Sequence, residues 1–229
     1  MIRAAIFAAV GVAGVAAVAL APVEASAQQD WAKSVVATPE GGYRMGNPNA
    51  PVKVVEYGSL TCPHCADFIN SAKAPIAAKV RTGKVSFEFR NFVLNGVDAT
   101  ATLLARCAAP AQFFPLVERI YATQPQWIAR FTGLSDEHKQ RIQALPEAER
   151  LLGVAEAAGL TQLAVQGGVP ADKAKSCLVD PAGLARIGEI YEAAAKLGVQ
   201  GTPSFFVNGK RVMVHDWAGL DGEIKKAGG

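Results

Sequence analysis

The chain has 229 residues, half of them hydrophobic, and a formal net charge of +3 at pH 7. This composition can supply a sizeable core, which excludes an intrinsically disordered protein. The net charge is small and no block of Lys and Arg runs along the chain, which argues against nucleic acid as a partner.

The first 27 residues predict a secretory signal peptide. Arg3 gives a positive start, residues 4–20 form an apolar run, and Ala25-Ser26-Ala27 fits the A-x-A cleavage pattern. The alternative is an uncleaved membrane anchor, although the apolar run falls short of the ~20 residues that span a bilayer. We therefore expect an exported protein whose mature chain starts at Gln28.

Export changes what the four cysteines can do, because disulfides form and persist outside the cytosol. An even count permits full pairing, with three possible connectivities. Cys62 and Cys65 are the obvious first pair, which leaves Cys107 with Cys177.

The N-terminal half predicts a strand, a helix and a second strand. Residues 28–47 predict an N-terminal arm, and turn-forming residues follow it. The β-branched run 52–57 predicts a buried strand, residues 62–81 a helix, and the alternating run 85–92 a second strand. This order forms a right-handed crossover, so we expect the two strands to be parallel.

Residues 98–180 contain no convincing strand and predict an inserted helical domain. Prolines and glycines divide the region into short elements. The expected helices cover residues 99–109, 111–122, 135–143, 146–158, 160–166 and 171–178.

The C-terminal segment predicts a helix, a hairpin and a last helix. Asp180-Pro181 is typical of a helix start, and this helix should run to about Leu197. Asn208-Gly209 between two apolar runs predicts a hairpin of antiparallel strands. Residues 216–227 predict the final helix.

Together these elements predict an α/β thioredoxin fold. We expect a four-stranded mixed sheet flanked by helices, with a helical domain inserted between the second and third strands. Residues 48–97 and 181–229 would form the thioredoxin-fold domain, and residues 98–180 the inserted domain.

The motif Cys62-Pro63-His64-Cys65 lies where the first predicted strand gives way to a helix. Two cysteines placed in this way exchange two electrons as dithiol and disulfide. A helix start stabilises an anion, so Cys62 is the expected nucleophile and Cys65 its resolving partner. Pro63 fits the first turn because it has no N–H to leave unsatisfied. His64 would donate to the Cys62 thiolate or add positive charge nearby; the alternative is an exposed loop histidine.

Together with two further segments, this motif resembles the DsbA-type thiol:disulfide oxidoreductases, a family within the thioredoxin superfamily. The resemblance runs from about Gly46 to the end of the chain in the order of elements. It implies that Cys62 has a lowered pKa and that its disulfide is a strong oxidant. The residues that carry it are Val54-Val55-Glu56-Tyr57, Cys62-Pro63-His64-Cys65-Ala66-Asp67-Phe68 and Gly201-Thr202-Pro203-Ser204-Phe205-Phe206-Val207-Asn208-Gly209.

The resemblance implies a buried acid at Glu56, six residues before Cys62. Its carboxylate would relay the proton of Cys65 when the disulfide is made or broken. A strand-end acid that faces water is the alternative. Lys84 and Arg90 are both candidates for a basic residue that offsets this acid.

The resemblance also implies that Thr202-Pro203 faces the cysteines, with the proline cis. The Thr202 backbone would then lie beside Cys62, ready to pair with an extended substrate strand. A trans turn proline is the alternative. Many DsbA proteins have Val before this proline, whereas isomerases and some other branches have Thr, so Thr202 leaves oxidase and isomerase both open.

We expect Cys107 and Cys177 to form a structural disulfide that closes a loop of about 70 residues. Two buried free thiols and a regulatory dithiol are the alternatives. A zinc site at the cysteine motif would need four ligands, and His64, His138 and His215 are the chain's three histidines. We therefore expect no metal and no cofactor.

The leading hypothesis is an exported, periplasmic oxidoreductase that donates the Cys62–Cys65 disulfide to reduced, unfolded proteins through a mixed disulfide at Cys62. The resemblance implies reoxidation by a membrane thiol oxidase similar to DsbB, and we expect a monomer. One alternative is a disulfide isomerase or reductase of the same fold, although residues 28–47 are too few for the dimerisation domain of DsbC-like isomerases. Another is a chaperone whose helical domain holds clients.

Overall fold

The computed structural model describes residues 1–2, 4–5 and 29–229. The expected signal peptide, residues 1–27, lies almost wholly outside the described residues. Within the described part of the chain, no helix is both long and apolar enough to cross a membrane.

A six-stranded mixed sheet forms the centre of the fold, with strand order β1-β2-β4-β3-β5-β6. Strands β3 and β4 are parallel, and every other neighbouring pair is antiparallel. The parallel pairing expected from the strand, helix and strand order is confirmed. The strands are β1 (Val35–Ala37), β2 (Tyr43–Gly46), β3 (Val52–Gly58), β4 (Val85–Asn91), β5 (Ser204–Val207) and β6 (Lys210–Val212).

The expectation of four strands was too low. Those four are β3, β4, β5 and β6, and the segment 28–47, expected to be an arm, adds a short helix (Trp31–Lys33) and strands β1 and β2. Strand β2 pairs with β4 in the register Met45↔Phe87. Because β1 and β2 have only three and four residues, they are too short to show a clear period in sequence.

Different helices cover the two faces of the central strand β3. Val54 belongs to the large core that also contains residues of α1 (Pro63–Arg81) and α10 (Trp217–Lys226). Tyr57 belongs to a smaller cluster with Phe206 and with Ala194 of α9 (Pro181–Lys196). Successive strand residues point to opposite faces, so Glu56 points to the same side as Val54, toward α1.

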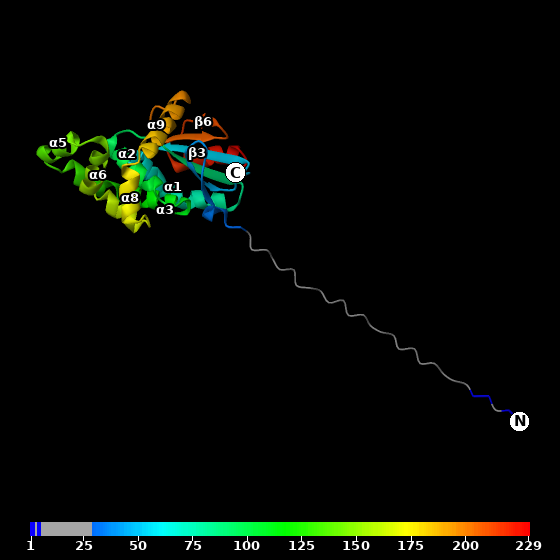
Figure 1. Ribbon diagram of the computed structural model, residues 1–229. Coiled ribbons are helices and arrows are strands. Elements are labelled where there is room, and N and C mark those ends of the chain that lie inside the picture. The colour runs from blue at the N-terminus through cyan, green and yellow to red at the C-terminus, as the bar shows by residue number, and fades with distance from the viewer. Residues whose placement is uncertain (3, 6–28) are drawn as a thin grey trace.

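The region between β4 and β5 is helical, as expected, and lies largely at one end of the molecule. Figure 1 shows α5, α6 and α8 at that end and strands β3 and β6 at the other. Its helices are α2 (Gly96–Arg106), α3 (Pro110–Ala122), α4 (Gln124–Thr132), α5 (Asp136–Ala144), α6 (Glu147–Ala158), α7 (Leu160–Gln166) and α8 (Ala171–Leu178), followed by α9.

Helix α4 was not predicted. Pro125 does not separate two helices but occupies the first turn of α4, where a missing N–H costs nothing. Helix α4 also places the buried side chain of Gln124 against the loop before Cys62, where its amide donates to the carbonyl of Leu60.

The predicted hairpin joins β5 to β6. Asn208 and Gly209 both have positive φ, 49° and 77°, which is the backbone that a tight two-residue hairpin turn requires. Pairing of β5 with β3 places Phe205 opposite Glu56, so the segment before β5 lies beside the cysteine motif.

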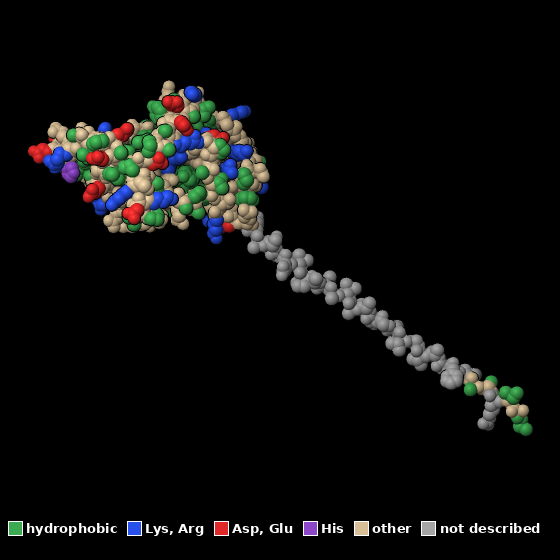
Figure 2. Space-filling view, in the orientation of Figure 1, with side chains coloured by type: hydrophobic (Ala, Val, Ile, Leu, Met, Phe, Trp, Pro, Cys, Tyr) green, Lys and Arg blue, Asp and Glu red, His purple; other side chains and the backbone are tan. Residues whose placement is uncertain are grey.

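Charged side chains of both signs are interspersed over the surface seen in Figure 2. No extended basic area occupies that face, in keeping with the small net charge.

Candidate active site at the start of helix α1

The motif Cys62-Pro63-His64-Cys65 forms the N-terminal turn of α1. Cys62 is the residue before the first turn, with an extended backbone (φ −79°, ψ 121°), and Pro63 begins the helix. Both cysteines are free thiols. Cys62 is 7% exposed and Cys65 is fully buried, so an incoming thiol would reach the motif through Cys62.

The surroundings of Cys62 lower the pKa of its thiol from 9.0 to about 5. The largest cause is a hydrogen bond from the Cys65 thiol, and further bonds come from Thr202 and from the backbone N–H groups of Cys65 and His64. Burial acts in the opposite direction. In the reduced protein at neutral pH, Cys62 is therefore a thiolate held at a helix start.

The pKa of Cys65 moves the other way, well above its ordinary value. Burial is the main cause, followed by the hydrogen bond to Cys62 and the negative charges of Glu56 and Cys62. The two sulfurs are thus clearly distinguished: Cys62 carries the charge and Cys65 keeps its proton.

Glu56 is fully buried on the α1 side of β3. Both of its carboxylate oxygens lack a hydrogen-bond partner among the described residues. Burial, and then the charge of Cys62, raise the pKa of Glu56 well above its ordinary value. Glu56 is therefore a buried acid, and the alternative of a strand-end acid that faces water is excluded.

Neither basic candidate reaches Glu56, so the expectation of an offsetting base is not met. Arg90 Nε lies 2.7 Å from Glu88 Oε1, and its Nη1 donates to the Tyr57 hydroxyl at 3.0 Å. Arg90 pairs in register with Tyr57, which faces the α9 side of the sheet. Lys84 is exposed and lies just before β4.

The Thr202–Pro203 peptide bond is cis and lies against the motif. The thiol of Cys62 donates to the carbonyl oxygen of Thr202, with 3.4 Å between sulfur and oxygen. The hydroxyl oxygen of Thr202 is buried and has no partner among the described residues in the thiol form, whereas a thiolate at Cys62 offers it one.

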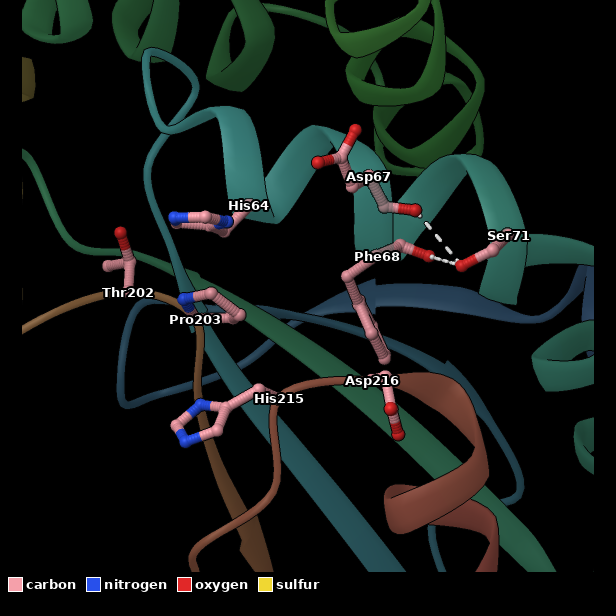
Figure 3. Close-up of a pocket in the computed structure, with 8 residues that line it drawn as sticks. All are labelled: His64, Asp67, Phe68, Ser71, Thr202, Pro203, His215 and Asp216. Carbon is pink, nitrogen blue, oxygen red and sulfur yellow. Dashed lines mark hydrogen bonds between the residues drawn. The ribbon is translucent and has the colours of Figure 1, made fainter.

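A pocket of about 330 Å³ adjoins these residues (Figure 3). His64 borders it from the first turn of α1, Pro203 from the cis-proline segment, and His215 from the segment between β6 and α10. The pocket opens beside the reactive turn and is walled by residues from three separate parts of the chain.

His64 is exposed and borders this pocket. Its backbone N–H helps to lower the pKa of Cys62. Within the described residues no hydrogen bond joins its imidazole ring to Cys62, so His64 lowers the pKa of Cys62 through its backbone N–H and not through its ring.

Sequence reasoning missed Asp98, a buried carboxylate at the first turn of α2. It accepts hydrogen bonds from Ser59 Oγ at 2.6 Å and from the backbone N–H groups of Leu60 and Leu94, each at 2.9 Å. Burial raises the pKa of Asp98 to about 6, although these bonds oppose the rise. Asp98 therefore ties the loop before Cys62 to the loop before α2.

Two further side chains of the helical region hold the same loop, and neither was expected. The hydroxyl of Tyr121 donates to the carbonyl of Ser59 at 3.0 Å. The side-chain amide of Gln124 donates to the carbonyls of Leu60 and Cys62 at 2.8 and 3.0 Å. A polar residue within a helical pattern gives no sign of this contact, because the partners lie about sixty residues away in the chain.

Cys107 and Cys177 are joined by a disulfide, with their Cα atoms 6.0 Å apart. The bond links the end of α2 to α8, within the helical region. In the residues that the structure describes, no three His, Cys, Asp or Glu side chains come together as a metal site would require.

A dithiol at the first turn of a helix, facing a cis-proline segment in a thioredoxin fold, defines the thiol:disulfide exchange proteins of the thioredoxin superfamily. The family model described as thioredoxin matches residues 38–226 of this chain. The crystal structure of a protein-disulfide isomerase from Novosphingobium aromaticivorans is 30% identical, with a TM-score of 0.74, over 80% of this chain and 95% of that chain. Wolbachia pipientis alpha-DsbA1 shares the fold at 24% identity, with a TM-score of 0.63, over 81% of this chain and 90% of that chain.

Curated relatives point to the same family. Disulfide bond formation protein D of Bacillus subtilis is 26% identical over 192 residues, which cover 80% of this chain and 73% of that protein. A Rickettsia bellii protein, whose name provisionally assigns it as a protein-disulfide oxidoreductase, is 29% identical over 190 residues, 80% of this chain. The match spans 63% of that relative's length. The chain belongs to the DsbA-like thiol:disulfide oxidoreductases of the thioredoxin superfamily.

Proposed function

We propose that this protein is an exported oxidase that donates the Cys62–Cys65 disulfide to newly secreted proteins. The observation that carries the proposal is the opposite displacement of the two thiol pKa values, lowered to about 5 at Cys62 and raised at Cys65. A stabilised Cys62 thiolate favours the reduced motif, and this makes the disulfide a good oxidant.

The first exchange step forms a mixed disulfide at Cys62. A substrate thiolate attacks the Cys62 sulfur, the Cys62–Cys65 bond breaks, and its electron pair goes to Cys65. The raised pKa of Cys65 means that this leaving sulfur must take up a proton. Glu56 lies on the same side of β3, and burial raises its pKa, so we assign it as the group that supplies this proton.

The second step releases the oxidised substrate. A second substrate thiolate attacks the substrate sulfur of the mixed disulfide, and Cys62 leaves as a thiolate. A low pKa makes Cys62 a good leaving group in this step. Two substrate thiols have then lost two electrons and two protons. The motif has gained both electrons and, at Cys65, one proton, and the second proton goes to solvent because Cys62 leaves as a thiolate.

Substrate binding at Thr202 follows from the same geometry. The Thr202 backbone lies against Cys62 just before β5, where an extended substrate segment would pair with it in the manner of an added strand. The expected substrates are reduced, unfolded exported proteins, because such chains offer extended backbone and free thiols.

Turnover requires reoxidation of the motif. A membrane thiol oxidase similar to DsbB, acting in the periplasm, is the proposed electron acceptor. Export through a cleaved signal peptide in residues 1–27 would bring the protein to that compartment.

The proposal is tested by mixing the oxidised protein with a reduced, unfolded protein that contains two cysteines. Stoichiometric oxidation of this substrate, with one motif reduced per disulfide formed, is expected. The Cys62→Ser variant cannot form the motif disulfide and serves as control. A wild-type protein that oxidises the substrate no faster than this variant would overturn the proposal.

A second candidate function is disulfide isomerisation. The relative from Novosphingobium aromaticivorans is named a protein-disulfide isomerase, and it is 30% identical to this chain. An isomerase acts from its reduced form, with the Cys62 thiolate attacking a wrong substrate disulfide. Recovery of a substrate with scrambled disulfides by the reduced protein, in the absence of oxidant, would favour this function over the oxidase.

A further inference from the structure

Gln124 contacts the backbone of the reactive motif from outside the thioredoxin-fold elements. It is the first residue of α4 and is only 4% exposed. Its Nε2 donates to two carbonyl oxygens, those of Leu60 at 2.8 Å and Cys62 at 3.0 Å. Both N–H bonds of one side-chain amide are thus used on the three residues that end at the nucleophile.

The carbonyl of Cys62 is a sensitive place to hold. It also accepts the N–H of Ala66 at 3.2 Å, the bond that starts α1. Because Pro63 has no N–H, the peptide group between Cys62 and Pro63 can be held only through this oxygen. The orientation of that peptide group sets where the Cys62 sulfur lies relative to the N–H groups of the first turn.

The stabilisation of the thiolate depends on that position. The backbone N–H groups of His64 and Cys65, and the Thr202 side chain, all help to lower the pKa of Cys62. Hydrogen bonds weaken steeply as their distance and angle depart from the optimum. A shift of the Cys62 backbone by a few tenths of an ångström would therefore weaken several of these bonds together.

We propose that Gln124 is a positioning residue for the Cys62 thiolate. By holding the Leu60 and Cys62 carbonyls, it keeps the sulfur between the first turn of α1 and Thr202. The helical insertion thereby controls the acidity of the nucleophile as well as enclosing it. The consequence for disulfide donation rests on the proposed function, whereas the effect on the Cys62 thiol does not.

A purely structural role is the competing interpretation, since loss of the Gln124 amide would leave the buried Leu60 carbonyl without this donor and the Cys62 carbonyl with Ala66 alone, which by itself would destabilise the fold. Trp127 provides the matched control. It lies on the same helix, is 1% exposed, and donates from Nε1 to the Ile120 carbonyl at 2.9 Å. Trp127→Phe therefore removes a buried hydrogen-bond donor of α4 that makes no bond to the loop before Cys62.

The experiment compares Gln124→Met with Trp127→Phe and the wild type. Thiolate absorbance of the reduced protein is followed against pH, and urea unfolding gives the stability of each variant. We expect Gln124→Met to raise the midpoint of the Cys62 titration by about half a pH unit or more. The equilibrium with glutathione should move about threefold toward the motif disulfide. Trp127→Phe should lower the stability without changing the midpoint of the Cys62 titration or the equilibrium with glutathione.

An unchanged Cys62 titration in Gln124→Met, or an equal displacement in Trp127→Phe, would overturn the proposal. If Gln124→Met does not fold, Gln124→Asn is measured instead, because its shorter side chain keeps an amide but cannot reach both carbonyls, and the same displacement is expected. The titration needs no substrate. Failure of the oxidase proposal therefore appears in the wild-type substrate assay, and failure of this one in the variant's titration.

Discussion

The sulfur of Cys62 lies 3.4 Å from the carbonyl oxygen of Thr202, although 140 residues separate them in the chain. This contact joins the first turn of α1 to the cis-proline segment before β5. The nucleophile and the backbone proposed to bind a substrate strand therefore form one surface, and the Thr202 side chain contributes to the acidity of Cys62.

Thr202→Val should raise the pKa of Cys62. The change removes the hydroxyl that stabilises the thiolate but keeps the branched shape and the backbone carbonyl. We expect a rise of about half to one pH unit in the thiolate titration of the reduced protein. Ser204→Ala is the matched control, because the Ser204 hydroxyl donates to the Gly201 carbonyl and not to Cys62. A titration that moves equally in both variants would contradict this role for Thr202.

Glu56→Gln should change the pH dependence of stability. A carboxyl whose pKa is raised in the folded state holds its proton more tightly there than in the unfolded chain. Above the unfolded pKa, near 4.5, stability therefore falls as pH rises toward the folded value, by up to about 1.4 kcal/mol per pH unit. The Glu56→Gln variant does not lose stability in this way, so its free energy of unfolding should increase relative to that of the wild type as pH rises.

Urea unfolding of the two oxidised proteins at several pH values measures this difference. The oxidised form removes the Cys62 charge, so that burial alone acts on Glu56. A stability difference between the two proteins that stays constant from pH 4 to pH 7 would show that the pKa of Glu56 is not raised in the folded protein.

Asp98→Asn should destabilise the protein by about 1–3 kcal/mol at pH 7. The carboxylate accepts from Ser59, Leu60 and Leu94, and an amide NH₂ in its place would face one of these donors. Asp180→Asn is the control. Asp180 caps α9 at an exposed position, and Asn caps helices equally well. Equal stabilities for the two variants in urea unfolding would show that the hydrogen bonds accepted by Asp98 do not stabilise the two loops.

Replacing both Cys107 and Cys177 with Ala should lower stability by roughly 4 kcal/mol, because the disulfide closes a long loop in the unfolded chain. Disulfide exchange at the motif should survive under conditions in which the variant is folded, since the bond lies between α2 and α8. Both are checked by urea unfolding and by the substrate assay. A folded variant without exchange activity would assign the second disulfide a direct role.

The elements that could be predicted from sequence are those with strong local signals. Local sequence determines the backbone conformation of three features: the β-branched run of β3, the Cys-Pro start of α1 and the Asn208-Gly209 turn. The order of the elements along the chain then predicts the parallel pairing of β3 with β4. The roles of the motif cysteines could be predicted without long-range information, because Cys62 lies just before the first turn of the helix and Cys65 lies within it.

What could not be predicted depends on contacts between distant parts of the chain. Strands β1 and β2 are short and are stabilised by pairing with β4. Asp98, Tyr121 and Gln124 have ordinary places in helices, and their importance comes from the loop carbonyls and N–H groups that folding brings to them. The offsetting base for Glu56 was wrong for a related reason, since strand alternation places Arg90 beside Tyr57 on the other face.

Under the proposed function, stabilisation of the Cys62 thiolate makes the motif a disulfide donor. A pKa of about 5 stabilises the reduced form at pH 7 by roughly 3 kcal/mol, or about 60 mV for two electrons. The most direct test is the reduction potential of Cys62–Cys65, measured by equilibration with glutathione. A value about 60 mV or more above the −270 mV of thioredoxin, that is about −210 mV or more positive, is expected, and a value near −270 mV would rule out thiolate stabilisation as the source of oxidising power.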